Sequence, residues 1–336
     1  MSDLHLNYIG SKRKLLNKLH RVFDKYINEK TVFADYFAGT GTVAYDVAHK
    51  YKCQVIANDL QYYAYVINKA NLTHYSTTDI NSINQYIEVI NNLSPEKGFI
   101  AREYGPPKRM YFTSSNARKI DAARIWLESK RNTMKTKVYY YVLAKIIVAA
   151  DKIANTSSVY ASYLKEFKPS SLKSFILTQF HDDNNNELYK NNKVYNLDIN
   201  KLTENIKIKP TVVYLDPPYN TRQYSDNYHI LDTIAKYDNP HIHGLTGIRD
   251  ELTRSEFASK VKAEQAFTEL INNLKNVNVI ILSYNDEGIL THDEIRKILK
   301  THGKVKLYKI KYPKFKAQEG VEREYLYEYI FVATKN

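Results

Sequence analysis

The stretch Leu215-Asp216-Pro217-Pro218-Tyr219-Asn220 ends a short apolar run, residues 211–215, whose pattern predicts a buried strand. Proline has no backbone N–H, so the two prolines cannot extend the strand, and the Asp216 carboxylate is presented at its carboxyl end. Ligands bind at that edge in open α/β sheets. An acid, a rigid bend and an aromatic ring can together hold a planar amine, because carboxylate and proline carbonyl oxygens accept its hydrogens while the ring stacks.

The composition favours a globular protein with an anionic partner. The chain has 336 residues and a formal net charge of +13, which favours nucleic acid over a membrane surface. A lysine-rich surface with no partner is the alternative. The only cysteine, Cys53, lies in an apolar run and is interpreted as a buried small residue, which excludes disulfides and a cysteine metal site. No signal-peptide core or run of 18 apolar residues is present, so we expect a cytoplasmic protein without a membrane partner.

Both ends of the chain alternate strands with helices. This rhythm predicts a parallel sheet. The pattern is interrupted in the middle of the chain, from about residue 74 to 190. Before this segment it predicts strands at 31–36 and 54–57 and helices at 43–50 and 62–70. After it the pattern gives strands at 193–198, 211–215 and 277–283, a helix at 255–274, and an antiparallel pair at 304–311 and 325–334.

Between these flanks the chain is charged, tyrosine-rich and mostly helical in pattern. Residues 116–129 and 137–153 are its clearest helices, and the polar stretch 181–187 indicates a surface loop. We therefore predict one domain from 1–73 and 191–336, with a second domain, 74–190, inserted into it.

A glycine turn follows the first strand. Gly39 and Gly41 suit a tight turn and a close backbone approach to a ligand, but no Gly-Lys-Ser/Thr follows, which excludes a P-loop. Asp59 ends the second strand 18 residues after Gly41, near the spacing of an acid that accepts hydrogen bonds from a ribose diol. A helix N-cap is the alternative for Asp59, and we favour the ribose.

Two further residues have open interpretations. Asp198 ends a later strand, where it suits contact with a purine amine or serves as a simple cap. Lys12, in Tyr8-Ile-Gly-Ser-Lys12, could neutralise a ligand carboxylate, or belong to a solvated helix start.

In this order the segments resemble the Dam-like alpha class of adenine-specific DNA methyltransferases. The matching pieces are Tyr8-Ile-Gly-Ser-Lys12, Asp35-Tyr-Phe37-Ala-Gly39-Thr-Gly41, Asn58-Asp59 and Asp216-Pro-Pro-Tyr219. In the insertion, Asn116-Ala-Arg-Lys-Ile-Asp121 and Ala154-Asn-Thr156 resemble the branch found beside type IIS restriction enzymes. Tyr8 stands where Dam proteins have Trp, and the insertion is longer than Dam's recognition domain.

The resemblance implies a mixed, mostly parallel seven-stranded α/β sheet of the Rossmann-like methyltransferase type and the cofactor S-adenosyl-L-methionine. It places Tyr8 and Lys12 on the cofactor, with Lys12 near its carboxylate. Further implied cofactor contacts are Asp35, Phe37, Gly39 and Gly41 at the methionine end, Asp59 on the ribose, Asp198 at the adenine, and Asp216. The inserted domain is implied to recognise the target in double-stranded DNA.

The implied reaction moves a methyl group to the exocyclic amine of an adenine that has been flipped out of the duplex. Asp216 and the Pro217 carbonyl would bind the amine and Tyr219 would stack on the base. Just beyond the motif, Asn220, Arg222 and Tyr224 are candidate DNA contacts, Arg222 on a phosphate or simply in a surface loop. Residues 283–285 are expected to border the target pocket. A cognate restriction endonuclease would share the target sequence rather than contact this chain.

The sequence alone is also compatible with other functions. One alternative is an RNA or cytosine-amine methyltransferase; cytosine enzymes of related type usually have Ser in place of Asp216. Another is a DNA-binding specificity protein without catalysis, against which the intact Asp216-Pro-Pro-Tyr219 argues. His241 and His243 resemble a metal pair, but no third ligand is spaced with them, so we expect a solvated loop and no metal.

Overall fold

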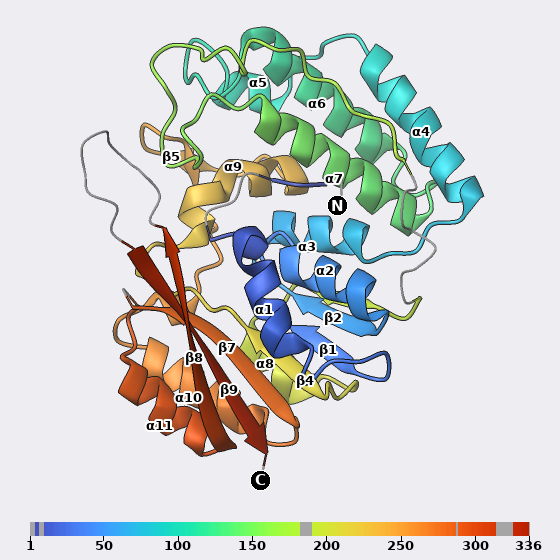
Figure 1. The fold of residues 1–336 in the computed structure, drawn as a ribbon. Coiled ribbons are helices and arrows are strands. Elements are labelled where there is room, and N and C mark those ends of the chain that lie inside the picture. Colours follow the sequence, from blue (N-terminus) through green and yellow to red (C-terminus); the bar gives the residue numbers. More distant parts are fainter. Residues whose placement is uncertain (1–3, 7–9, 182–189, 287, 314–324, 336) are drawn as a thin grey trace.

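The computed structural model describes residues 4–6, 10–181, 190–286, 288–313 and 325–335. Its centre is one sheet with helices on both faces, and further helices lie beyond the carboxyl edge of the parallel strands (Figure 1). The strand order is β3-β2-β1-β4-β7-β9-β8. The strands are β1 Val32–Asp35, β2 Gln54–Asn58, β3 Lys193–Tyr195, β4 Val212–Leu215, β7 Val279–Asn285, β8 Gly303–Pro313 and β9 Tyr325–Lys335.

The sheet has the expected mixed topology. Strands β3, β2, β1, β4 and β7 pair in parallel, whereas β9 pairs antiparallel with both β7 and β8. Alternate residues of β4 enter different cores. Val212 and Tyr214 pack with α1 (Leu16–Phe23) and α2 (Thr42–Tyr51). Val213 and Leu215 pack with α8 (Ile199–Asn205), α10 (Ala263–Asn273) and α11 (His292–Lys300). A parallel strand buried on both faces must be apolar throughout, which explains why 211–215 is a continuous apolar run. Cys53 is fully buried, as expected.

The helices agree with the sequence pattern in the amino-terminal half and less well later. The amino-terminal half holds η1 Lys12–Leu15, α1 Leu16–Phe23, α2 Thr42–Tyr51, α3 Tyr62–Asn71, α4 Thr77–Asn92, α5 Phe99–Glu103, α6 Ser114–Ser129 and α7 Thr136–Lys152. Beyond them lie α8 Ile199–Asn205, α9 Tyr224–Lys236, η3 Glu256–Ala258, α10 Ala263–Asn273 and α11 His292–Lys300, with a small antiparallel pair, β5 Ile242–His243 and β6 Ile248–Arg249.

Two predicted elements differ from the structure, and a third lies mostly outside the described residues. The single helix predicted for 255–274 is wrong, because the chain forms the short η3, turns, and begins α10 at Ala263. The strand predicted for 193–198 is shorter: it ends at Tyr195, because Asp198 already caps α8. Of the surface loop predicted for 181–187, residues 182–187 lie outside the described residues.

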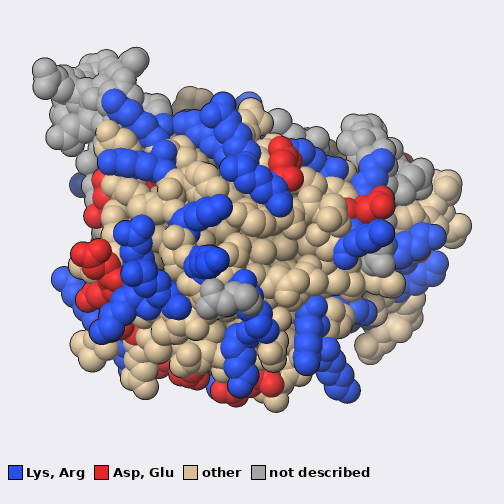
Figure 2. All heavy atoms as spheres, turned by 60° about the horizontal axis from the view of Figure 1, so that its bottom comes forward, with Lys and Arg blue, Asp and Glu red and all other residues tan. Residues whose placement is uncertain are grey.

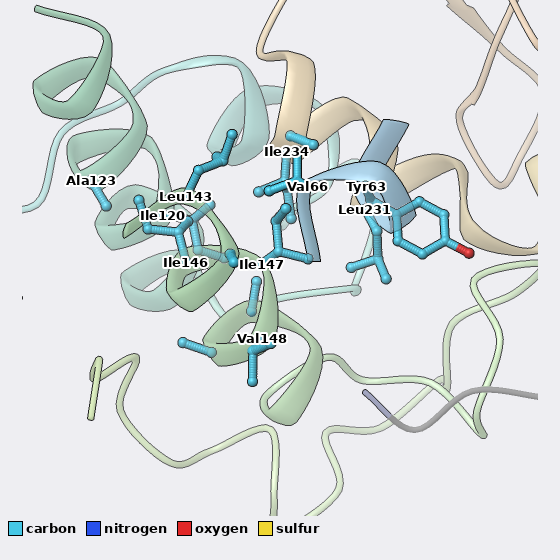
Figure 3. Packing of buried hydrophobic residues seen from close by; sticks show 14 of the residues in the cluster. Tyr63, Val66, Ile120, Ala123, Leu143, Ile146, Ile147, Val148, Leu231 and Ile234 are labelled. Carbon is cyan, nitrogen blue, oxygen red and sulfur yellow. The ribbon is translucent and has the colours of Figure 1, made fainter. Parts of the chain in front are cut away.

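Nearly all the buried apolar side chains described for the inserted segment 74–190 belong to a cluster that it shares with helices outside it. Leu143, Ile146 and Ile147 of α7 lie in one apolar cluster with Val66 of α3 and Ile234 of α9, so the insertion packs on helices from both flanks (Figure 3). The predicted domain boundaries therefore lie between segments, the insertion on one side and α3 and α9 on the other, that share this apolar cluster.

The two insertion motifs have structural partners. Asn116 donates from Nδ2 to the carbonyls of Ser171 (3.2 Å) and Lys173 (2.8 Å), and Asn155 donates to those of Met110 and Leu164 (both 3.0 Å). These amides fix the long irregular segment that follows α7, because they satisfy backbone groups that no helix or strand pairs.

Basic side chains are scattered over the lower face of the molecule and do not form one continuous patch there (Figure 2). Figure 2 shows the underside of the molecule in Figure 1, where Lys and Arg are scattered with uncharged surface between them. Among the described residues, no helix combines the length and the apolar character needed to cross a membrane.

Asp121 links α6 to the start of α5. Its buried carboxylate accepts hydrogen bonds from the backbone N–H groups of Gly98 (2.9 Å), Ile100 (2.9 Å) and Ala101 (2.8 Å), and from the Tyr237 hydroxyl (2.7 Å). It therefore satisfies N–H groups that the first turn of α5 leaves unpaired.

We predict that Asp121→Asn lowers the free energy of unfolding by about 3 kcal/mol, because the amide NH2 must face buried donors. Urea denaturation measures the change. The control is Asp293→Asn on the exposed face of α11, which should change the free energy by less than about 0.5 kcal/mol. Equal effects of the two substitutions would contradict this role for Asp121.

Candidate active site

Three acidic residues lie at the carboxyl ends of neighbouring strands. Asp35 is the last residue of β1, Asp59 follows β2, and Asp216 follows β4. Because β1 pairs in parallel with both β2 and β4, these ends meet at one edge of the sheet. The edge predicted for Asp216 is confirmed.

A pocket of about 700 Å³ opens at this edge. Five residues singled out from the sequence line it together: Phe37, Asp59, Asp198, Asp216 and Tyr224. Residues as far apart in the chain as Phe37 and Tyr224 are thus brought together in one concave site, as expected of a ligand pocket in an α/β sheet.

One wall of the pocket was not anticipated. The Gln223 side chain donates to the Ser255 carbonyl (3.1 Å) and accepts from the Ser255 N–H (2.9 Å), and Gln61 donates to the Thr253 carbonyl (3.2 Å). Phe257 then packs edge-on against Phe37, with ring centroids 5.0 Å apart. Isolated glutamines have no sequence signature, so only the tertiary structure reveals this wall.

Asp59 is held by backbone donors. Its carboxylate accepts from the N–H groups of Gly39 and Gln61, both at 2.8 Å. The residue at the N-cap of α3 is Gln61, so Asp59 precedes the cap rather than forming it. Burial raises the pKa of Asp59 to about 7. The two N–H donors oppose this increase in the pKa, and the negative charge of Asp232 adds to it.

Gly39 and Gly41 shape the turn behind the pocket without lining it. Gly41 has φ +79°, and a Cβ there would lie 2.5 Å from Oδ1 of Asn68. The Asn68 amide donates to the Gly39 carbonyl at 2.8 Å. The glycine at 41 is therefore required both by backbone conformation and by the approach of Asn68.

Asp198 is confirmed as a helix cap and also lies in the pocket wall. Oδ1 accepts from the N–H groups of Asn200 (3.1 Å) and Lys201 (3.3 Å), which makes it the N-cap of α8, and the residue also lines the pocket. Asp35 is deeper: it is buried, and its Oδ1 has no hydrogen-bond partner within the described part of the chain. Burial, followed by repulsion from Asp216 and Asp59, holds the pKa of Asp35 well above its usual range.

Lys12 lies between two acids. Its Nζ is 2.8 Å from Oδ1 of Asp216 and 3.1 Å from Oε1 of Glu328. Burial alone would lower the pKa of Lys12, but the two carboxylates outweigh it and hold that pKa well above the usual value. Burial raises the pKa of Asp216 to about 6, against the opposing effect of Lys12 and with a further increase from Glu328. The sequence did not indicate Glu328, which is over 300 residues from Lys12.

The remaining candidates are more dispersed. Pro217 is buried and, with Tyr284, borders a separate, small apolar pocket. The Tyr219 ring is half-buried, with its centroid 6.3 Å from that of Tyr284. Asn220 and Arg222 are exposed outside the pocket. Tyr8 lies outside the described residues.

The histidine pair is exposed at the β5–β6 hairpin. His241 and His243 each place Nδ1 2.5 Å from a different oxygen of Asp250. Within the described ranges, no group of three or more His, Cys, Asp or Glu side chains could hold a metal ion. Ser283 hydrogen-bonds to Glu328 instead of lining the pocket.

We predict that Gly41→Ala costs more stability than Gly244→Ala. Both glycines have positive φ, +79° and +69°, so alanine is strained by about 1 kcal/mol at either position. Only at Gly41 does the new Cβ meet a neighbour, which adds about 1–3 kcal/mol, whereas nothing lies within 4 Å of a Cβ at Gly244. Urea unfolding of the two variants gives the difference directly, and equal losses would show that Asn68 moves freely.

The chain has close relatives among characterised enzymes. It is 37% identical to the type II methyltransferase M.NlaIII of Neisseria lactamica, with 98% of this chain and 99% of that protein covered. It is 32% identical to the type II methyltransferase M.CviAII of Paramecium bursaria Chlorella virus 1, with 97% of each covered. It is also 35% identical to the type II methyltransferase M.FokI of Planomicrobium okeanokoites, but spans only 53% of that longer protein.

The family model for D12 class N6 adenine-specific DNA methyltransferases matches residues 8–298, from the N-terminal basic segment through Asp216-Pro-Pro-Tyr219 to α11. This confirms the resemblance drawn from the motifs. The chain belongs to the D12 class N6 adenine-specific DNA methyltransferase family.

Proposed function

We propose that this methyltransferase uses S-adenosyl-L-methionine to methylate the exocyclic amine of an adenine flipped out of duplex DNA, within a restriction-modification system. The single observation that supports this best is that the Asp216 carboxylate lines the same pocket as Phe37 and Asp59. An amine acceptor and a nucleotide-type site are thus side by side.

The chemistry of the pocket fits this cofactor. Asp59 and Asp216 line the pocket and Asp35 is buried near both, and the mutual repulsion of these carboxyl groups is relieved by a positively charged sulfonium. We assign Phe37, Asp59 and Asp198 to cofactor binding and keep Tyr8 as a candidate. When bound, S-adenosyl-L-methionine supplies an electrophilic methyl group.

The protein's part in the reaction is alignment. The Asp216 carboxylate accepts a hydrogen bond from the adenine amine and draws its lone pair out of conjugation with the ring, and the Pro217 carbonyl accepts the second. Tyr219 stacks on the base and offsets the few kcal/mol that flipping costs. Lys12 fixes one oxygen of Asp216 through the 2.8 Å ion pair.

DNA contacts follow from exposure and position. Asn220 and Arg222 are exposed just beyond the motif, where they can reach the backbone of the flipped strand. Tyr224 lies in the pocket and is assigned to the base or cofactor rather than to the duplex surface. We assign target recognition to the insertion, 74–190.

The relatives M.NlaIII and M.FokI are named type II methyltransferases, a designation used in restriction-modification systems. A cognate endonuclease would act on the same DNA sequence and need not touch this chain. Sequencing methylated bases in DNA exposed to the enzyme identifies that sequence and the modified base together.

We predict that Asp216→Ala reduces transfer of labelled methyl from S-adenosyl-L-methionine to duplex DNA by about 100-fold or more, because the amine loses its acceptor. Leu197→Ala in the pocket wall is the control for loss of bulk and should retain activity within about tenfold. RNA and cytosine-only duplexes are tested in parallel. Transfer to either at the rate of adenine-containing DNA, or none to DNA by the intact protein, would refute the proposal.

We predict an acid limb in the pH dependence of kcat/KM with a midpoint near 6. Burial raises the pKa of Asp216 to about 6, and protonation removes the negative charge with which it draws on the amine, so activity is full above that pH and falls about tenfold per unit below it. Steady-state kinetics between pH 5 and 9 measure the limb. A flat profile down to pH 5 would show that this group does not control the reaction.

A further inference from the structure

Glu328 lies next to the proposed amine acceptor although it is remote in sequence. It belongs to β9, opposite Asn285 at the carboxyl end of β7. Since β9 runs antiparallel to β7, a residue near its start reaches the same sheet edge as Asp216. Its Oε1 lies 3.1 Å from Lys12 Nζ, which is itself 2.8 Å from Asp216 Oδ1.

The three groups are a buried chain of charges. Lys12 is 6% exposed and Glu328 2% exposed, so both ions are largely removed from water. Ser283, on β7, also donates a hydrogen bond to Glu328 Oε1, so one oxygen of the carboxylate is held by two partners. Buried ions of this kind are tolerated only when they are paired and hydrogen-bonded.

This arrangement affects how Asp216 can act. The Lys12 ammonium occupies Oδ1, and the substrate amine needs the other oxygen of the same carboxylate. With Asp216 as its only partner, the ammonium would be less restrained. Glu328 supplies a second anionic partner, which holds the ammonium at a second point.

From these contacts we infer that Glu328 is a positioning residue for adenine methylation, which acts by holding Lys12 against Asp216. The inference rests on the proposed function of Asp216. Glu328 touches neither base nor cofactor in this role, and it is not a proton donor in the reaction.

The role also predicts a change in titration. The titratable groups that face Asp216 are Lys12, Glu328, Asp35, Tyr214 and Tyr224. Glu328 is a like charge that raises the pKa of Asp216, so its neutralisation lowers that pKa and moves the acid limb to lower pH.

Glu328→Gln tests the inference in the full-length protein. We expect kcat at pH 8 to fall about tenfold while KM for DNA and for S-adenosyl-L-methionine stays within about twofold, with the acid limb moved to lower pH. Glu294→Gln, at a half-buried glutamate in the capping box of α11, is the matched control and should change none of these. An unchanged kcat together with an unmoved limb would overturn the inference, as would equal changes in kcat and both KM values.

A titration of the protein alone separates this inference from the proposed function. Carbon-13 NMR of the Asp216 carboxyl, assigned with Asp216→Asn, should titrate at lower pH in Glu328→Gln than in the natural sequence, whether or not methyl transfer occurs. An unchanged midpoint refutes the coupling. If Glu328→Gln does not fold, Ser283→Ala is used, and it should lower kcat in the same direction with KM retained; no loss of kcat would refute the role.

Discussion

The parallel pairing of β1 with both β2 and β4 is the constraint on which the site depends. Parallel strands end at the same edge, so acids placed after three separate strands must converge there. The prolines after Asp216 then prevent the strand from continuing and leave its carboxylate in the pocket. Converging carboxyl groups repel one another, and the site is therefore suited to a cation and an amine.

The N-terminal segment and the last strand complete this edge. Lys12 is brought to Asp216 by η1, and Glu328 is brought to Lys12 because β9 inserts antiparallel beside β7. Nearly the whole length of the chain therefore lies between Lys12 and Glu328. Folding of the catalytic part and organisation of the amine acceptor depend on the same contacts.

The insertion is joined to the catalytic part through a shared core rather than a linker. Helix α7 packs on α3 and α9, and α9 begins at Tyr224, which lines the pocket (Figure 3). A segment assigned to target recognition is thus packed directly on the helix that leaves the active-site motif. The motif residues Asn116 and Asp121 serve this framework through hydrogen bonds to the backbone.

The sequence by itself determined the strand that ends at Asp216, the glycine turn, the acid after β2 and the helices α2, α3, α6 and α7. Those features depend on short-range periodicity and backbone conformation, which local sequence encodes. Only the tertiary structure decided that Glu328 neutralises Lys12, that Gln61 and Gln223 hold a wall of the pocket, and that the helix predicted for 255–274 breaks. These outcomes depend on contacts between residues distant in the chain, made by residue types that are common elsewhere, so no local pattern marks them.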